Sequence, residues 1–553
     1  MTGLRAGVAP REALLALLAY VLLTLLFFNH YLPLLNDFII GPLADNVWIY
    51  WCLWLDEQIC AGGGQSFDFT DYLYFPEGNA MAGCDWSFYN LAVARVLRAL
   101  FFRPFLYNFL ILHAFVLSGL GGYLLIRYLT GSRLAALAGG FVYAFSPAQV
   151  AHTQYHLGQI SIQFIPFFIL YLIRCLRTGG TRRDLALAAL FFLLNALCSL
   201  YFFVYALYFL LFAYLYLAWR RRRWLLPGVL GRMALIAGVT LLVLLPRLGK
   251  MAAMSLGSPA TIQRPTHDIF VVDLAALVIP HPYHWLTENC PRLAEINSGY
   301  TGNNWEATAY LGWANLALIL AAGTLFRPEA RRYLLGFLAF LALALGSHLH
   351  VAGYVTGIPL PYAVLQHVPL LNVARAPNRL RPFLYLFLAI MVAHAVRELW
   401  QRRGRLPKVL LVVLLLMLVA DFYSDRREAT CVEYVPAYAA MANDGPRYGV
   451  LDLPGGELRY TMQYMMYQTF HGKPIVHGHN ARRVGTSLRD YLELADLARQ
   501  RRQLTDGRVR YIVVHKPLLT DPYSTWPPVD LARYRAAYTA VHEDEQALVL
   551  RVY

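Results

Sequence analysis

Residues 134–173, LAALAGGFVYAFSPAQVAHTQYHLGQISIQFIPFFILYLI, form an uncharged stretch of 40 residues. A helix needs about 20 apolar residues to cross a membrane, so this stretch is twice as long as one crossing requires. Its middle contains Ser146-Pro147 and the polar residues 152–156, which are typical of a break between helices. The stretch therefore predicts two membrane-spanning helices joined by a short loop.

The composition of the whole chain supports a membrane protein. Of its 553 residues, 58% are hydrophobic and only 15% are charged, whereas soluble proteins carry about 25% charged residues. The net charge is +15, but the arginines lie in short clusters beside apolar stretches. Orientation in a membrane explains such clusters better than binding to nucleic acid.

Further apolar stretches lie on both sides of this hairpin. Residues 185–219 predict a second hairpin, broken at residues 195–199. Single spans are predicted at residues 14–35, 104–126, 228–246, 307–326, 333–348, 382–396 and 409–420. The chain is thus expected to be an α-helical polytopic membrane protein with about 11 transmembrane helices.

Arginine clusters predict the orientation of these helices. If both hairpins cross twice, the clusters around Arg127, Arg174, Arg220 and Arg331 all fall on one side. Cytoplasmic loops are rich in Lys and Arg, so this side is expected to be cytoplasmic. The N-terminus is then cytoplasmic, whereas loops 36–103, 247–306 and 350–381 and the C-terminus are extracytoplasmic.

The chain changes character after residue 420. Residues 448–453 and 509–515 have the pattern of strands, and residues 488–501 that of an amphipathic helix. About 130 residues suffice for one small domain. We therefore expect a transmembrane domain at residues 1–420 and a small α/β extracytoplasmic C-terminal domain at residues 421–553.

The first outer loop contains two candidate catalytic carboxylates. Asp37 follows the first span, and Asp45 precedes an aromatic segment that includes Trp48. A carboxylate at the membrane edge is costly to desolvate, which suits it to act as a general base. The alternative is an ordinary loop aspartate beside an interfacial tryptophan belt.

Three arginines in the loop at residues 350–381 run against the topology rule, because they lie on the outer side. Arg375, Arg379 and Arg381 surround Pro377, which stiffens the loop. A guanidinium binds phosphate through two hydrogen bonds, so these residues suit a lipid-linked phosphate. Headgroup anchoring and pairing with an acidic loop residue remain alternatives.

Histidines and cysteines provide weaker signals. His152 and His156 would share one face of a helix, and His281 and His284 lie near Glu288. Such pairs can bind a metal, but spacing fixes no third ligand, which favours a polar role lining a cavity. No cofactor is fixed, and a divalent metal ion stays open. Cys60 and Cys84 flank one loop and either form a disulfide or remain free thiols.

The sequence lacks the nucleotide-binding and hydrolase motifs that would indicate soluble chemistry in the cytoplasm. Transporters usually place ionisable residues within their spans, whereas these spans hold almost none. The polar residues concentrate in the outer loops and the tail. This distribution favours an enzyme that acts at the outer membrane edge.

Several segments resemble bacterial membrane glycosyltransferases of the GT-C superfamily, in particular an uncharacterised subgroup. They are the tryptophan-rich first loop, YLYFPEGN at residues 72–79, AHTQYHLGQ at 151–159, and PLPYAVLQHVPLLNVARAPNRLRPF at 359–383. The tail segment GKPIVHGHNARR at residues 472–483 is also similar. The likeness covers residues 12–420.

The resemblance implies an inverting glycosyltransferase with a polyprenyl-phosphate-linked sugar donor and an acceptor in the cell envelope: a glycan, a lipid or a protein. Asp45 would be the general base, with Asp37 as its competitor. The three arginines would hold the donor phosphate, and the histidines would line the cavity with Trp48. The expected location is the bacterial inner membrane. A lipid or polysaccharide transporter or flippase is the alternative, and a non-catalytic scaffold is a third.

Overall fold

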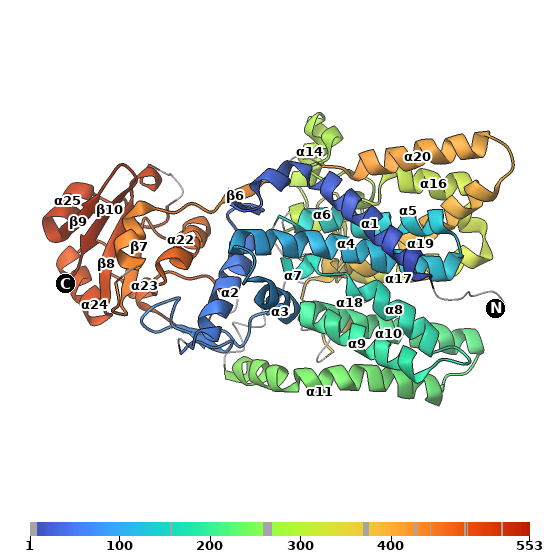
Figure 1. Ribbon diagram of the computed structural model, residues 1–553, viewed down its shortest axis with the longest axis horizontal. Helices are drawn as coiled ribbons and strands as arrows, with labels where there is room; N and C mark the ends of the chain where they lie inside the picture. Colours follow the sequence, from blue (N-terminus) through green and yellow to red (C-terminus); the bar gives the residue numbers. More distant parts are fainter. Residues whose placement is uncertain are drawn as a thin grey trace.

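The computed structural model describes residues 8–62, 64–154, 157–257, 268–302, 304–368, 375–424, 428–442, 444–480, 483, 485–520 and 524–553. Long helices fill one end of the molecule, and a small four-stranded sheet with its own helices lies at the other (Figure 1). The fold is therefore that of a helical polytopic membrane protein with a small α/β unit near the C-terminus, as predicted.

Seven helical stretches of the described residues are long and apolar enough to cross a membrane. They span Pro10–Phe27, Arg103–Thr130, Arg133–His152, Leu157–Cys175, Leu200–Arg221, Pro227–Met254 and Pro377–Gln401. The other predicted spans correspond to shorter helices: α9 (Arg182–Cys198), α16 (Trp313–Ala322), α17 (Pro328–Ala344) and α20 (Leu406–Phe422). The protein is a multi-pass membrane protein.

The predicted hairpin at residues 134–173 is broken where Ser146-Pro147 and the polar residues indicated. It consists of α5 (Arg133–Ala144), α6 (Pro147–His152), α7 (Leu157–Ile160) and α8 (Phe164–Cys175). α5 packs closely on α4 (Arg103–Thr130), where a Cβ atom added to Gly122 would lie 3.0 Å from the Gly140 Cα. Small residues allow such close approach between helices in lipid.

Two predicted spans end at other residues in the structure than the sequence indicated. α1 (Pro10–Phe27) stops before residue 35, and a 3-10 helix, Asn29–Leu34, follows it. Pro33 cannot continue the α-helical hydrogen bonds and crowds the carbonyl four residues earlier, which accounts for the early end. By contrast, α11 (Pro227–Gly257) continues through Pro246, where the predicted span ended.

The extension of α11 is held by the first loop, residues 36–103. Arg247 donates hydrogen bonds to the carbonyl oxygens of Met81 and Cys84, at 3.1 and 2.9 Å, and pairs with Asp68. These contacts stabilise the helix beyond its apolar part, although Pro246 removes one backbone hydrogen bond. Arg247 is therefore part of a helix that leaves the apolar stretch, rather than the first residue of a loop.

Short elements connect the long helices. The first loop contains β1 (Phe38–Ile40), α2 (Asp45–Cys60), β2 (Phe69–Thr70), β3 (Asn79–Ala80) and α3 (Phe88–Leu97). Later loops contain α13 (Trp285–Glu288), α14 (Pro291–Ser298), α15 (Asn304–Ala307), β4 (His348–Val351), β5 (Tyr354–Pro359), α18 (Tyr362–Leu365) and a 3-10 helix, Pro377–Leu380, before α19 (Arg381–Gln401).

The C-terminal sheet has the strand order β7-β8-β10-β9. β7 (Gly449–Leu453) and β8 (Val509–His515) are parallel and correspond to the two predicted strands, whereas β10 (Ala547–Arg551) is antiparallel to β8 and to β9 (Thr539–Glu543). The remaining elements are β6 (Ala429–Cys431), α21 (Ala439–Ala442), α22 (Leu458–His471), α23 (Leu488–Tyr491), α24 (Leu497–Asp506) and α25 (Leu531–Ala537).

The predicted amphipathic helix at residues 488–501 is two helices instead of one. α23 ends at Tyr491, and α24 begins after Asp496, whose side chain accepts hydrogen bonds from the backbone N–H groups of Ala498 and Arg499. Aspartate is a favourable N-cap because its carboxylate satisfies N–H groups that have no partner within the helix. The sequence pattern was periodic, but this cap restarts the helix.

Candidate functional site

The first loop is fixed at its start. The buried side chain of Asn108 on α4 accepts a hydrogen bond from the Ile40 N–H at 3.0 Å and donates to the carbonyl oxygens of Leu35 and Phe38. β1 also pairs with β6 in antiparallel register. The chain therefore enters α2 from an anchored strand.

Gly41 makes the turn between β1 and α2. Its φ of +112° is in the region that favours glycine, and an added Cβ would lie 2.7 Å from the Gln154 carbonyl oxygen. Gln154 in turn accepts a hydrogen bond from the Glu428 N–H at 2.9 Å. This turn brings the first loop, residues 152–154 and the segment after α20 together.

Asp45 is the first residue of α2, with 39% of its side chain exposed. Its Oδ1 lies 3.7 Å from Nε2 of His479, a residue of the C-terminal segment whose side chain is 26% exposed. Trp48, one turn further along α2, packs edge-on against the His479 ring and stacks on Trp51. The predicted base and Trp48 thus share one partner from the tail.

The other predicted acid lies elsewhere in the loop. Asp37 is exposed in the turn before β1, and its backbone carbonyl accepts a hydrogen bond from the Val432 N–H at 2.8 Å. Asp45, by contrast, faces His479 of the C-terminal segment. The two candidate bases therefore occupy different surroundings.

Backbone hydrogen bonds join the first loop to the tail beside His479. The N–H groups of Tyr74 and Phe75 donate to the carbonyl oxygens of His477 and Ile475, both at 3.1 Å, and Ile475 N–H donates to the Tyr72 carbonyl at 2.9 Å. Ile475 also forms a parallel bridge with Val450 of β7. Residues 72–75 and 475–477, which are far apart in the sequence, therefore pair with each other.

α2 rests on α22 of the tail, and Figure 1 shows α2 standing between the long helices and the sheet. Trp51 donates a 2.7 Å hydrogen bond from its indole to the side chain of Gln468, which is buried. Gln468 in turn donates to the carbonyl oxygens of Tyr72 and Lys473, at 2.7 and 2.9 Å. The helix that begins with Asp45 is thereby fixed to the C-terminal domain.

The electrostatic surroundings of His479 favour a neutral imidazole. Burial lowers the pKa of His479 below its ordinary value of 6.5, the carboxylate of Asp45 raises it in part, and Arg489 lowers it further. Arg489 also reaches the carbonyl oxygens of Gly478 and Gly456, each at 3.4 Å. At neutral pH a negative Asp45 therefore faces an uncharged ring.

The predicted arginines lie around a buried glutamate. Arg379 donates to Oε1 of Glu306 at 3.1 and 2.5 Å, and Arg381 lies 3.7 Å from Oε2. Arg381 is only 1% exposed; it donates to the Thr308 carbonyl and lies 2.7 Å from Nε2 of His152. Of the alternatives considered, pairing with an acidic loop residue is the one present in this arrangement.

The remaining predicted residues are placed as follows. Arg375 is half-buried just before the 3-10 helix, and His156 lies outside the described residues. His281 and His284 are buried in the loop after α11, and Nε2 of His284 lies 3.3 Å from Oδ1 of Asp421 at the end of α20. His281 and His284 pack against each other, with ring centroids 5.9 Å apart.

The other acids of the first loop are held by structural contacts. Asp56 pairs with Arg95, Glu57 with Arg103, and Asp71 with Arg447, whereas Glu77 and Asp85 accept backbone hydrogen bonds from Leu488 and Leu200. Each of these carboxylates thus has a structural partner at its own position in the loop.

Metal ligands and disulfides were also open from the sequence. Within the described ranges, no group of three or more His, Cys, Asp or Glu residues could hold a metal ion. Cys60 and Cys84 are both free thiols, the first exposed and the second buried, so the disulfide alternative is wrong. Cys84 instead lies 3.5 Å from the Asn480 side chain, beside the paired segments.

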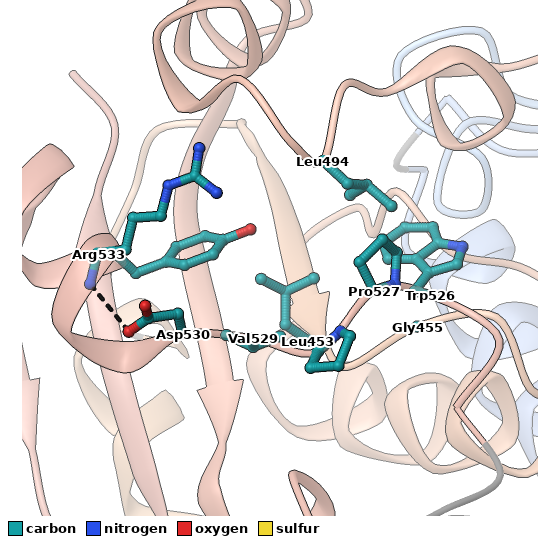
Figure 2. A pocket seen from close by; sticks show the side chains of 10 residues that line it. Leu453, Gly455, Leu494, Trp526, Pro527, Val529, Asp530 and Arg533 are labelled. Carbon is teal, nitrogen blue, oxygen red and sulfur yellow. Dashed lines mark hydrogen bonds between the residues drawn. The ribbon is translucent and has the colours of Figure 1, made fainter.

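A shallow pocket lies in the C-terminal domain itself. It is lined by Leu453, Gly455, Leu494, Pro527, Val529 and Tyr534, among others, with Trp526 at one side. Figure 2 shows Asp530 turned to the backbone of Arg533, to which it is hydrogen-bonded. None of the predicted site residues that the structure describes lines it, so it is separate from the Asp45 site.

Sequence reasoning missed three residues of this arrangement: Glu306, His479 and Gln468. His479 lies in a segment that was noted for its resemblance, which was the available signal. Glu306 was only the end of a predicted loop. Gln468 lies in a helix with no distinguishing motif.

The sequence matches a protein family over most of its length. A family described as "Domain of unknown function (DUF6311)" matches residues 46–423, which is most of the chain. The chain belongs to this family. No curated protein matches the chain.

Comparison with solved structures shows the fold of this chain. The Archaeoglobus fulgidus oligosaccharyltransferase in the apo form matches with a TM-score of 0.53 at 12% identity, over 92% of this chain and 70% of that one. The same organism's oligosaccharyltransferase AglB, in complex with an inhibitory peptide and a dolichol-phosphate, matches with a TM-score of 0.50 at 12% identity, over 92% and 69%. The chain therefore shares the fold of these two oligosaccharyltransferase structures, as expected from the sequence resemblance.

Proposed function

We propose that this protein is a glycosyltransferase that moves a sugar from a polyprenyl-phosphate-linked donor to an extracytoplasmic acceptor in the cell envelope. The acceptor is a glycan, a lipid or a protein. The observation that supports this most is the placement of Asp45. It stands at the start of α2 in the first outer loop, is partly exposed, and is held by elements from both parts of the chain.

Asp45 would act as the general base. Its carboxylate takes the proton of the acceptor hydroxyl, and the oxygen attacks the anomeric carbon of the donor sugar. The bond between that carbon and the phosphate oxygen breaks, and its electron pair remains on the phosphate. Attack from the side opposite to the leaving group inverts the anomeric centre.

The arginine cluster would bind the leaving phosphate. Arg379 keeps 14% of its side chain exposed, whereas Arg381 is enclosed by Thr308 and His152. We therefore assign the phosphate contact to Arg379 with Arg375, and a supporting position to Arg381. Two guanidinium groups share Glu306, so a bound phosphate would add negative charge where the arginines are concentrated.

The distribution of arginines supports an extracytoplasmic position of the Asp45 site. Arg127 and Arg133 pair with Glu12 where α1 begins and α4 ends, while the first loop adjoins the opposite end of α4. If these arginines are cytoplasmic, the Asp45 site and the C-terminal domain are extracytoplasmic. We propose the bacterial inner membrane as the location. A neighbour's solved complex contains a dolichol-phosphate, which fits a lipid-linked donor.

A transfer assay with the purified full chain tests the proposal. Proteoliposomes are supplied with labelled polyprenyl-phosphate sugars and with cell-envelope acceptors. Both are extracted with solvent from the cells that naturally contain the protein. Asp45→Asn is expected to lower transfer by at least about 100-fold, because a general base typically contributes 10²–10⁴-fold. Asp37→Asn is the matched control and should keep transfer near the wild-type rate.

Three outcomes would redirect this assignment. Full transfer by Asp45→Asn with loss in Asp37→Asn would move the base to Asp37. Movement of lipid-linked sugar across the bilayer without any transfer would favour the transporter or flippase instead. No transfer and no movement by the wild-type protein would end the enzymatic proposal.

A further inference from the structure

The C-terminal domain places one titratable side chain, that of His479, beside the predicted base Asp45. His477, Gly478, His479 and Asn480 pass between the first loop and the sheet. His477 accepts a backbone hydrogen bond from Tyr74, and the Asn480 side chain donates to the Ala80 carbonyl at 3.2 Å. A Cβ atom added to Gly478 would lie 2.7 Å from the Tyr74 ring. The segment has little freedom, so the position of His479 is set on both sides.

The charged groups that face His479 come from two elements. Asp45 at the start of α2 lies 3.7 Å away, and Arg489 on α23 opposes a positive charge on the ring. Trp48 covers the ring edge-on, with centroids 6.2 Å apart. Trp48 shields one side of the ring, whereas 39% of the Asp45 side chain is exposed, so solvent partly screens the interaction between Asp45 and His479.

We propose that His479 is a positioning residue for Asp45, so that the C-terminal domain completes the transfer site. This inference rests on the proposed function. Nε2 of His479 lies 3.7 Å from Oδ1 of Asp45, just outside hydrogen-bond distance, so a small approach lets the Nε2–H of a neutral imidazole orient the carboxylate. The negative charge of the carboxylate then stays free to take the acceptor proton. A protonated imidazolium instead forms an ion pair with Asp45 and makes that carboxylate a poorer base.

The inference predicts a specific pH dependence. The pKa of His479 is lowered from 6.5, so the ring is neutral at neutral pH and gains its proton only in acid. Transfer should therefore be lost as the pH falls below 6.5 and His479 becomes charged. A substitution that removes the neutral imidazole of His479 and adds no charge should reduce turnover without abolishing it, because only the orientation of Asp45 is disturbed.

Two substitutions separate orientation from charge. His479→Gln keeps an N–H donor that cannot titrate. Its kcat should fall by about 10-fold or less, with KM unchanged. The loss of kcat in acid (the acid limb of the pH profile) should move to lower pH. His479→Lys places a positive charge beside Asp45 at neutral and acidic pH, and transfer should be lost throughout that range. The matched control is His542→Gln, since His542 pairs with Asp544 at 3.0 Å on the exposed strand β9; its profile should equal that of the wild type.

A measurement that does not need activity accompanies the assay. Diethyl pyrocarbonate modifies neutral histidine, and peptide mass spectrometry of the full chain reports the pH midpoint for His479. Asp45→Asn removes the anion that raises the pKa of His479, so the midpoint should move to lower pH. If the wild type transfers sugar but the acid limb in His479→Gln and the midpoint in Asp45→Asn are both unmoved, His479 has no such role. If the wild type does not transfer sugar at all, the proposed function fails first, and the His479 role fails with it.

Discussion

At the scale of single residues, Glu306 is the centre of the arginine cluster. It is 2% exposed, accepts hydrogen bonds from Arg379 and Asn378, and lies near Arg381. Glu306→Gln removes the carboxylate and leaves two enclosed guanidinium groups beside a neutral amide. Removing one partner of a buried ion pair costs about 3–5 kcal/mol, so the detergent-solubilised protein should unfold at a clearly lower temperature.

The control for this prediction is Glu329→Gln, because Glu329 is exposed near the start of α17. Its unfolding temperature should match the wild type. An unchanged unfolding temperature in Glu306→Gln would show that the arginines find other partners without cost. Inorganic phosphate added to Glu306→Gln should restore part of the lost stability if the arginines accept an anion in its place.

The arginines could be selected from the sequence because their outer position conflicts with the topology rule. Their partner could not be selected in the same way. Glu306 lies more than 70 residues before Arg379, and no spacing links the two. Asp45 could be proposed from the sequence, but its neighbour His479 could not, since only the folded chain brings α2 and the tail together.

At the scale of elements, Glu77 fastens α23 to the first loop. Its carboxylate accepts hydrogen bonds from the Leu488 N–H at 3.0 Å and from the Tyr491 hydroxyl at 2.7 Å. Glu77→Ala leaves the first N–H of α23 without this acceptor, which should cost about 1 kcal/mol and speed amide exchange at residues 488–491. Hydrogen exchange with mass spectrometry measures this, and Glu545→Ala, an exposed site, is the control. Equal exchange in both variants would contradict the assignment.

Elements with a strong local pattern were predicted well. The break at Ser146-Pro147, the break before Leu200 and the strands β7 and β8 follow from residues within the elements themselves. The single helix at residues 488–501 was wrong because Asp496 can cap a new helix as readily as it can sit within one. Pairing of residues 72–75 with 475–477 was beyond local pattern, since register between distant segments depends on the whole fold.

At the scale of the whole molecule, the architecture was predicted from the long uncharged stretches and the arginine clusters. A bilayer demands long apolar helices, so composition alone constrains this part of the chain strongly. The docking of the tail has no such constraint. It depends on buried polar contacts such as Trp51 with Gln468, which become visible only when both partners are placed. The same docking links the stability of the tail to the geometry of the Asp45 site.

This link predicts acid sensitivity of the C-terminal domain. Burial lowers the pKa of both His471 and His477 to about 4, from 6.5 in an exposed chain. Between pH 6.5 and 4 the unfolded state therefore binds more protons than the folded state, so stability falls as the pH falls. The slope is at most about 1.4 kcal/mol per pH unit for each histidine, and the full contribution is present above pH 6.5.

Hydrogen exchange of β7 and β8 in the full chain, corrected for the intrinsic pH dependence, measures this slope at pH 7 and pH 5. The double variant His471→Gln and His477→Gln should have a flatter slope even if its stability at pH 7 is lower, whereas His542→Gln should retain the wild-type slope. A wild-type slope of zero would mean that the buried rings are protonated in the fold at no cost. Because His479 acts directly on Asp45, the double variant should leave the acid limb of transfer in place, which separates acid unfolding of the tail from protonation at the site.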